Sequence, residues 1–300
     1  MTAYRAFRFC VLCLAGTAGC LDPTGALVPR AKTTPPPPTF DESGSFAWRV
    51  VWGMSQAEFA RNVRTLKRQG YRPHDLEVYR YEDQTRFAGI FLKDPRAWQA
   101  RWRRTRGAFD ADFRLLRDRG YQPIDLEVIN ERGALRYSSV WIENPGGPAW
   151  RARWDLTHEQ LLDELEEYRR KGYRPTDLEI YDIGGKTRYA YVMIHDPRGA
   201  DCEALWHKAA ETMKRELRSL VSRGYRVVAL EGSTVHGELR WSAIFSKDRR
   251  MRDSTFTVCR SSGQIHRAIR DLGSRYRPIH FGVTRHKEGG YQYFWVWQRN

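Results

Sequence analysis

The chain has 300 residues, of which 41% are hydrophobic and 29% charged, and this apolar content excludes a wholly disordered protein. Its formal net charge is +15, from 51 Lys and Arg against 36 Asp and Glu. Such a charge permits an anionic partner, namely nucleic acid, polyanionic glycan or lipid headgroups, but does not require one.

The first nineteen residues have the order of parts of an export signal. Arg5 and Arg8 precede a short apolar run, Phe9 to Gly19, that ends in small residues. This run is about half as long as a bilayer-spanning helix, so it predicts cleavage rather than a membrane anchor. Thr17-Ala18-Gly19 before Cys20 resembles the lipobox of bacterial lipoproteins, although Thr17 stands where Leu is usual. The resemblance implies a lipid on the Cys20 sulfur; cleavage without lipid is the alternative.

A Pro- and Thr-rich segment follows, from Leu21 to about Ser45, with Pro35-Pro36-Pro37-Pro38 at its centre. This composition favours an extended polyproline spacer. We therefore expect a signal peptide at 1–19, a lipidated cysteine and tether at 20–45, and a globular part at 46–300. Because Leu21 rather than Asp follows Cys20, the signal for inner-membrane retention known from many Gram-negative lipoproteins is absent. The expected location is the outer membrane of a bacterial envelope.

A ten-residue pattern recurs five times beyond the tether. It reads GYRPHDLEVY from Gly70, GYQPIDLEVI from Gly120, GYRPTDLEIY from Gly172, GYRVVALEGS from Gly224 and RYRPIHFGVT from Arg275. The spacing divides the chain into five units of about 50 residues, at about 46–95, 96–147, 148–199, 200–250 and 251–300. A period in this range is typical of a solenoid, a propeller or another array.

Each unit opens with a short segment, and in the first three units it carries two tryptophans four residues apart. Small residues lie between them and arginines alternate with them, which predicts a strand with an aromatic face. A helix would also bring positions four apart together. The tryptophans are Trp48 and Trp52, Trp98 and Trp102, and Trp150 and Trp154. We expect them in the core, and an exposed platform for glycan, extended peptide or single-stranded nucleic acid is the alternative.

An amphipathic helix and a hairpin follow in each unit. Phe59, Val63 and Leu66 share one helical face, and Gly70 ends the helix in the left-handed conformation that glycine favours. The proline of the GYRP junction then extends the chain into a strand, a turn follows, and a second strand such as RFAGIFL returns.

These elements predict an α+β repeat protein of five strand–helix–hairpin units with antiparallel sheet. Neither end has a clearly polar cap, since the last strand carries Tyr293, Phe294, Trp295 and Trp297. We therefore expect a ring or propeller-like toroid rather than an open solenoid.

The unit resembles the bacterial tandem repeat domain found ahead of β-lactamase-like serine hydrolases, including the polyglycine hydrolases. The resemblance rests on the W-x3-W segment, the GYRP-type junction and the return strand, and it covers residues 46–300. It implies an exported, non-catalytic repeat region that accompanies or binds something. The hydrolases need a Ser-x-x-Lys motif, and no serine of this sequence has Lys three residues on. We therefore expect no catalytic residues.

Four Glu–Arg pairs lie nine residues apart across the hairpins: Glu77 and Arg86, Glu127 and Arg136, Glu179 and Arg188, and Glu231 and Arg240. This spacing predicts structural cross-strand ion pairs in which each Arg lowers the pKa of its Glu. The fifth unit changes both partners together, to Gly282 and Gln292. A ring of ligand-binding carboxylates is the alternative.

Two cysteines remain beyond Cys20, and they suit an oxidising compartment as one disulfide or as two buried thiols. They are Cys202 and Cys259. His207 and His266 lie near them in the sequence but match no zinc-finger spacing, so we expect no metal site and no cofactor.

Together these features predict an exported, lipid-anchored, non-enzymatic binding or scaffold protein. Through the family resemblance, a protein or peptide is the first candidate for its partner. An anionic polymer is second, because removing Arg5 and Arg8 with the signal leaves a net charge of +13. We expect membrane contact through the lipid only. A hydrolase with a carboxylate site inside the ring is the third candidate.

The first testable prediction concerns the anchor. Mass spectrometry of the exported protein is expected to show cleavage before Cys20 and a lipid on its sulfur. An unmodified Cys20 at the new N-terminus would contradict the lipoprotein interpretation.

Overall fold

The computed structural model describes residues 40–42, 48–196, 201–235, 238–247, 253–285 and 290–299. The expected signal peptide, Cys20 and most of the tether lie outside these residues. Within them, no helix is both long enough and apolar enough to cross a membrane.

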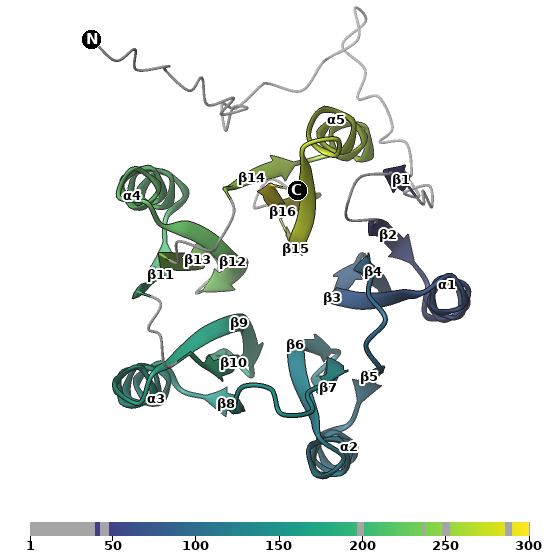
Figure 1. Ribbon diagram of the computed structural model, residues 1–300. Coiled ribbons are helices and arrows are strands. Elements are labelled where there is room, and N and C mark those ends of the chain that lie inside the picture. Colours follow the sequence, from purple (N-terminus) through teal and green to yellow (C-terminus); the bar gives the residue numbers. More distant parts are fainter. Residues whose placement is uncertain are drawn as a thin grey trace, which may run out of the picture. The chain divides into compact units, whose positions relative to one another are not determined.

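The first repeat shows the plan of the unit (Figure 1). β2 (Trp48–Met54), α1 (Gln56–Arg68), β3 (Tyr71–Tyr81) and β4 (Gln84–Lys93) follow in chain order. All strands pair antiparallel, and β4 lies between β2 and β3. The short strand β1 (Phe40–Glu42), which falls in the predicted tether, adds to the free edge of β2. These three residues thus lie at the edge of the first sheet, and the tether and its bounds stay a prediction.

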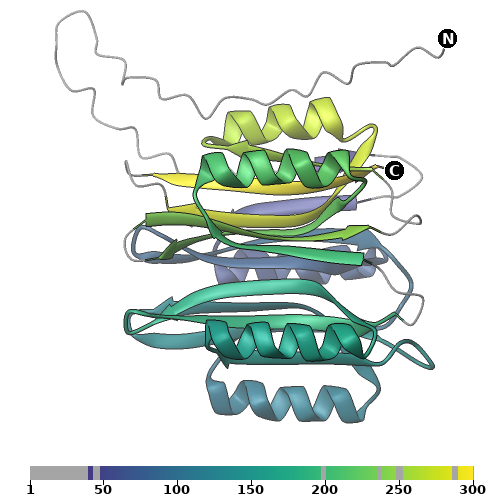
Figure 2. The same ribbon diagram turned by 90° about the vertical axis from the view of Figure 1, so that its left-hand side faces the viewer.

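The other four repeats have the same order of elements, which confirms the predicted strand–helix–hairpin unit. Each forms one three-stranded sheet with the return strand of its hairpin in the middle. In Figure 2 the helices run along the strands of their own sheets. The elements are β5 (Trp98–Arg104), α2 (Arg106–Asp118), β6 (Tyr121–Glu131) and β7 (Ala134–Glu143); β8 (Trp150–Leu156), α3 (His158–Arg170), β9 (Tyr173–Ile183) and β10 (Lys186–His195); β11 (Asp201–Lys208), α4 (Ala210–Ser222), β12 (Arg226–Val235) and β13 (Glu238–Lys247); β14 (Ser254–Cys259), α5 (Ser262–Leu272), β15 (Tyr276–Arg285) and β16 (Tyr291–Arg299).

Local signals in the sequence fix the ends of the helices. Ser55 accepts a hydrogen bond from the backbone N–H of Glu58, and the Glu58 carboxylate accepts one from the N–H of Ser55 at 2.8 Å. This reciprocal capping begins α1, which buries Phe59 and two aliphatic residues of the same face. Gly70 then follows the helix with φ +82°, a left-handed conformation that glycine adopts without strain.

A bulge in each opening strand was not predicted from the sequence. The residue after the second aromatic position has a positive φ in four repeats, and the pairing register shifts there: Gly53, Arg103, Asp155 and His207. In the first and third repeats the N–H of this residue donates to a tyrosine hydroxyl, Tyr79 or Tyr181. In the second and fourth it donates to a serine hydroxyl, Ser138 or Ser242. Two different side chains thus satisfy the same buried donor.

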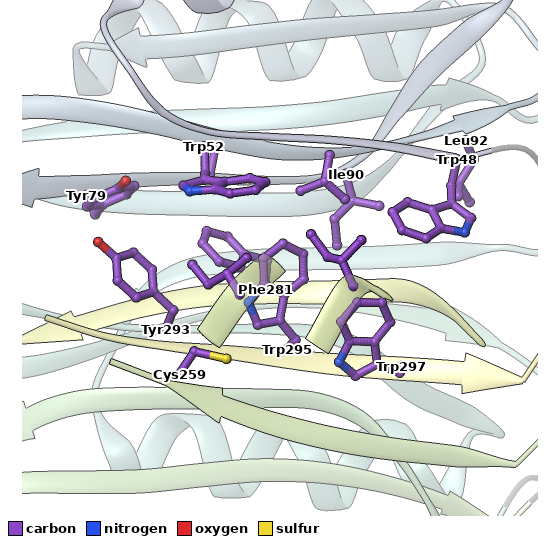
Figure 3. Packing of buried hydrophobic residues seen from close by; sticks show 14 residues of the cluster. Trp48, Trp52, Tyr79, Ile90, Leu92, Cys259, Phe281, Tyr293, Trp295 and Trp297 are labelled. Atoms are coloured by element: carbon purple, nitrogen blue, oxygen red, sulfur yellow. The ribbon is translucent and has the colours of Figure 1, made fainter. Parts of the chain in front are cut away.

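The paired tryptophans join one repeat to the next. Trp102 packs edge-on against Phe59 of α1, with ring centroids 5.7 Å apart, and Trp154 does the same against Phe109 of α2, at 4.9 Å. Trp52 meets Trp295 of the fifth repeat at 6.4 Å (Figure 3). Burial therefore explains the motif as core.

The alternative of an exposed aromatic platform is wrong for the first repeat, because Trp48 and Trp52 are 1% and 0% exposed. The four later tryptophans are half-buried and pack against the preceding repeat's cluster: Trp98, Trp102, Trp150 and Trp154.

The first strands of the five hairpins contact one another in order. β3 contacts β6, β6 contacts β9, β9 contacts β12 and β12 contacts β15. β15 in turn contacts β3, and one buried cluster combines β2, β3 and β4 with α5, β15 and β16. The expected closed array, as opposed to an open solenoid, stays a prediction, and these contacts between the fifth and first repeats support it.

The second prediction tests the packing of that cluster. Trp295→Ala removes a fully buried indole, which should lower the free energy of unfolding by about 3–5 kcal/mol. Leu162→Ala on α3 is the control, because Leu162 is 41% exposed and its loss should cost within about 0.5 kcal/mol. Chemical denaturation measures both. Equal effects of the two substitutions would contradict the burial of Trp295 between repeats.

Candidate functional site

The four glutamates are not paired with the arginines predicted for them. Glu77 lies opposite Ala88, and Arg86 lies opposite Tyr79. The turn of this hairpin is formed by residues 82 and 83, whereas a pair of Glu77 with Arg86 would need a turn at residues 81 and 82. This shift of one residue moves the cross-strand partner of every residue by two positions. The other hairpins share the offset, with Glu127, Glu179 and Glu231 opposite Ser138, Ala190 and Ser242.

Within the described part of the chain, no ion pair joins any of the four predicted partners. The arginines instead contact groups on their own strand or near their own turn. Arg86 bonds to Gln84, Arg136 to the carbonyl of Leu135 and to Glu131, Arg188 to the carbonyl of Thr187, and Arg240 to Glu238. The predicted structural ion pairs are therefore wrong, and the glutamates have other partners.

Seven carboxyl groups from four repeats form two buried layers on β3, β6, β9 and β12. One layer contains Asp75, Asp125 and Asp177, and the other contains Glu77, Glu127, Glu179 and Glu231; none is more than 9% exposed. The three aspartates were not among the predicted site residues. The signal for them was the Asp-Leu-Glu triplet that recurs in the first three repeats.

The carboxylates accept backbone N–H groups from the neighbouring repeat. Asp125 accepts from Leu76 at 3.2 Å, and Asp177 accepts from Leu126 at 2.8 Å. Asp75 accepts from Phe281 of the fifth repeat at 3.0 Å. Since these donors lie on the strand that precedes each acceptor around the array, the aspartates join successive repeats.

The glutamates of the second layer repeat this pattern one step along the strands. Glu127 accepts from the N–H of Val78 at 3.4 Å, and Glu77 accepts from Val283 of the fifth repeat at 3.3 Å. Val128 provides the corresponding backbone hydrogen bond to Glu179. The recurring Glu is therefore part of the contact between repeats.

Burial and crowding raise the pKa values of these carboxyl groups. Burial is the main cause for Glu77, Glu127, Glu179 and Asp125, and neighbouring carboxylates add to it. Burial also raises the pKa of Asp177 to about 7 and raises that of Glu231. The prediction that an arginine lowers the pKa of each Glu is wrong, because burial raises these pKa values and no ion pair joins these glutamates to an arginine among the described residues.

The fifth repeat places His280 where three others have Asp, and Gly282 where four have Glu. His280 Nδ1 lies 2.9 Å from Asp75 and Nε2 lies 2.8 Å from Glu231. Burial opposes a charge on this imidazole, but the two carboxylates outweigh burial and raise the pKa of His280 well above its usual range. No group of three or more His, Cys, Asp or Glu among the described residues could hold a metal ion.

A pocket of about 380 Å³ lies where the glutamate layer meets the turn ends of the hairpins. All four glutamates line it, together with Arg80, Asn130, Asp182 and Arg285, which occupy one equivalent position in four of the repeats. Its one serine, Ser233, has an Oγ without a hydrogen-bond partner, so no base activates it as a nucleophile. The pocket can bind a ligand through carboxyl, amide and guanidinium groups.

The pocket lining does not include Cys202, Cys259, His207 or His266. Cys202 and Cys259 are free thiols in this structure rather than a disulfide, and of the two only Cys259 is buried, since Cys202 is half-buried. Cys259 packs in the cluster between the first and fifth repeats, where burial raises the pKa of its thiol to about 12 (Figure 3). His207 hydrogen-bonds to Tyr189, and His266 packs on Trp52.

A family model for a polyglycine hydrolase-like structural repeat matches residues 46–94, 95–144, 147–195 and 199–248. The chain belongs to this family. The four matches coincide with the first four repeats of the structure, and the fifth repeat, which has the same elements, lies beyond them. No curated protein matches the chain. The resemblance inferred from the Trp and GYRP motifs is thereby confirmed.

The third prediction follows from the raised pKa of Asp177. Its folded value of about 7 exceeds the usual value of about 3.9, so the folded state binds more protons between these values. The stability that Asp177 contributes is therefore complete below about pH 4 and is lost as the pH rises through 7. The Tm should be lower at pH 8 than at pH 5, and Asp177→Asn should reduce this difference.

The buried glutamates titrate in the same direction, so the difference should shrink in Asp177→Asn without vanishing. Asp163→Asn, at an exposed position on α3, is the matched control and should leave the difference unchanged. A thermal melt at both pH values measures it. If Asp177→Asn behaves like the control, the raised pKa is refuted.

Proposed function

We propose that this protein is an exported, lipid-anchored and non-enzymatic repeat protein, a binding or scaffold module at the bacterial cell envelope whose partner is a protein or peptide. Its tandem repeats belong to a family whose other members include regions ahead of hydrolase domains. Export and the lipid on Cys20 are supported by the sequence of the first twenty residues.

The observation that carries the binding role is the variation around the pocket. The position after Tyr79 and its equivalents contributes Arg80, Asn130, Asp182 and Arg285 to the lining. The repeats thus resemble one another in their buried layers but differ at the pocket. The polar groups that line the pocket are therefore different from one repeat to the next. Such a set recognises a partner in one orientation.

The buried layers argue against catalysis. An acid–base pair needs two carboxyl groups in different environments, whereas Glu77, Glu127 and Glu179 share burial and one kind of backbone partner. His280 differs from them, but both of its ring nitrogens contact carboxylates. It therefore has no free nitrogen with which to take a proton from a substrate.

A protein or peptide fits the pocket better than an anionic polymer does. Carboxyl groups from four glutamates and from Asp182 share its lining with two arginines, so the lining lacks the excess of cations that a polyanion needs. The anionic polymer would have to bind elsewhere, for example at the exposed arginines of α1, Arg61, Arg64 and Arg68. A peptide can provide the amide and amino groups that carboxylates and asparagine accept.

The fourth prediction compares two charge reversals. Arg80→Glu changes the pocket lining, and Arg64→Glu makes the same change of charge on the outer face of α1. In a pulldown from envelope extract, the wild type and Arg64→Glu should capture the same partner protein and Arg80→Glu should lose it. Capture should also persist when the salt concentration is raised from about 0.05 to 0.2 M.

The opposite pattern would support the alternative. If Arg64→Glu abolishes capture, and if capture by the wild type falls steeply with salt, the protein binds an anionic polymer through its outer surface. If the wild type converts a component of the extract and Arg80→Glu does not, the non-enzymatic role is wrong.

A further inference from the structure

The fifth repeat departs from the others at the two positions that face the buried carboxyl layers. In chain order, the first layer reads Asp75, Asp125, Asp177, Ala229 and His280, and the second reads Glu77, Glu127, Glu179, Glu231 and Gly282. No other repeat has a group that is able to become positively charged at either position. This repeat is also the one that the family model does not match.

His280 contacts residues of two other repeats, the first and the fourth. Nδ1 lies 2.9 Å from Oδ1 of Asp75 on β3, in the first repeat. Nε2 lies 2.8 Å from Oε1 of Glu231 and 3.1 Å from the carbonyl oxygen of Leu230, both on β12 in the fourth repeat. One imidazole from β15 thus connects strands that are about 155 residues apart in the sequence.

We propose that the fifth repeat is a closing unit, in which His280 joins Asp75 of the first repeat to Glu231 of the fourth and so closes the array after five repeats. The inference concerns the architecture and does not depend on the proposed function.

The charges around His280 explain why this position differs. Asp75 and Glu77 face it from β3, Asp125 from β6, Asp177 from β9 and Glu231 from β12. An aspartate here would add another carboxyl group against Asp75 and Glu231 without a donor for either. The imidazole has two N–H groups and provides one to each side. His74 lies nearby, but burial lowers its pKa to about 3, so it does not compete as a cation.

Packing explains the second departure of the fifth repeat, which is Gly282 in place of the recurring Glu. A Cβ atom at this position would lie 2.0 Å from the ring of Phe294, so no larger side chain fits there. Phe294 packs against Trp241 of the fourth repeat, with ring centroids 5.3 Å apart. At this position the fifth repeat thus has its own aromatic ring in place of a buried glutamate, and the ring adds an apolar contact with the fourth repeat to the contact between His280 and Glu231.

The contact between the fifth and first repeats has the pattern described for the other repeats, in which carboxylates accept backbone N–H groups. Asp75 accepts the N–H of Phe281, and Glu77 accepts the N–H of Val283. Near the turns of these two hairpins, Glu82 donates its N–H to the hydroxyl of Tyr291 at 2.6 Å, and Tyr81 stacks on Tyr291 at 4.5 Å. The amides of Phe281 and Val283 therefore report on whether the two ends are joined.

The fifth prediction is tested by hydrogen–deuterium exchange of the full chain. His280→Asp, which restores the residue of the first three repeats, should speed exchange of the Phe281 and Val283 amides about tenfold or more. The amide of Leu126, which donates to Asp177 away from this contact, should exchange as in the wild type. X-ray scattering should show a larger radius of gyration for the variant.

Asp125→Asn is the matched control, because it changes a carboxyl group of the same layer whose donor is Leu76. It should leave the amides of Phe281 and Val283 protected. If His280→Asp unfolds the whole chain, His280→Gln decides, since it keeps a donor without a charge and should still speed exchange at these two amides. Wild-type protection at both amides in His280→Asp or His280→Gln would overturn the proposal, as would rapid exchange there in the wild type.

Discussion

The hydrogen bond from a strand amide to a buried carboxylate of the next repeat is the constraint on which the rest of this structure depends. A carboxylate taken out of water is costly unless donors replace its hydration, and here the donors are backbone N–H groups of another repeat. A single repeat therefore cannot satisfy its own Asp-Leu-Glu segment. Each unit needs a neighbour on that side, and a chain of such units needs something different where the series stops. Ala229, His280 and Gly282 are the departures from the series that the sequence contains.

The same constraint determines the electrostatics of the interior. Seven carboxyl groups share a small volume with one imidazole, and burial raises the pKa values of most of them. The imidazole of His280 contacts two of these carboxyl groups, with Nδ1 2.9 Å from Asp75 and Nε2 2.8 Å from Glu231. Acidic side chains are thus concentrated in the buried layers, although the formal net charge of the chain is +15. The sign of the net charge is consequently a poor guide to what the pocket accepts.

The sequence predicted the elements well because their signals are local. The capping residues, the apolar spacing and the glycine after each helix lie within one unit, and five copies repeat them. The predicted Glu–Arg pairing failed because register depends on which two residues form the turn, and a shift of one residue in the turn moves every partner by two. The alternation of Leu76 and Glu77 in the sequence is typical of a half-buried strand, whereas both faces of β3 are covered, one by α1 and the second repeat and the other by the fifth. No pattern within one unit shows which neighbour covers it.

Comparison of the five repeats with one another separates structural from functional positions without any homologue. In the first repeat, Tyr79 on β3 accepts the N–H of the bulge residue, and β4 has Ala88 at the second position. In the second repeat, Ser138 on β7 accepts it, and β6 has Ile129 in place of the tyrosine. The two positions therefore change together for a structural reason. The glutamate recurs in four repeats, and in each of them it contacts a neighbouring repeat. The position of Arg80 follows neither rule: it is Asn130 in the second repeat, Asp182 in the third and Arg285 in the fifth, and all four of these residues line the pocket. Variation at a structurally equivalent, pocket-lining position is what recognition of an asymmetric partner would select. The residues that repeat most faithfully in this chain therefore maintain its architecture, and if the proposed partner binds at the pocket, the residues that break the repeat there determine the specificity of that binding.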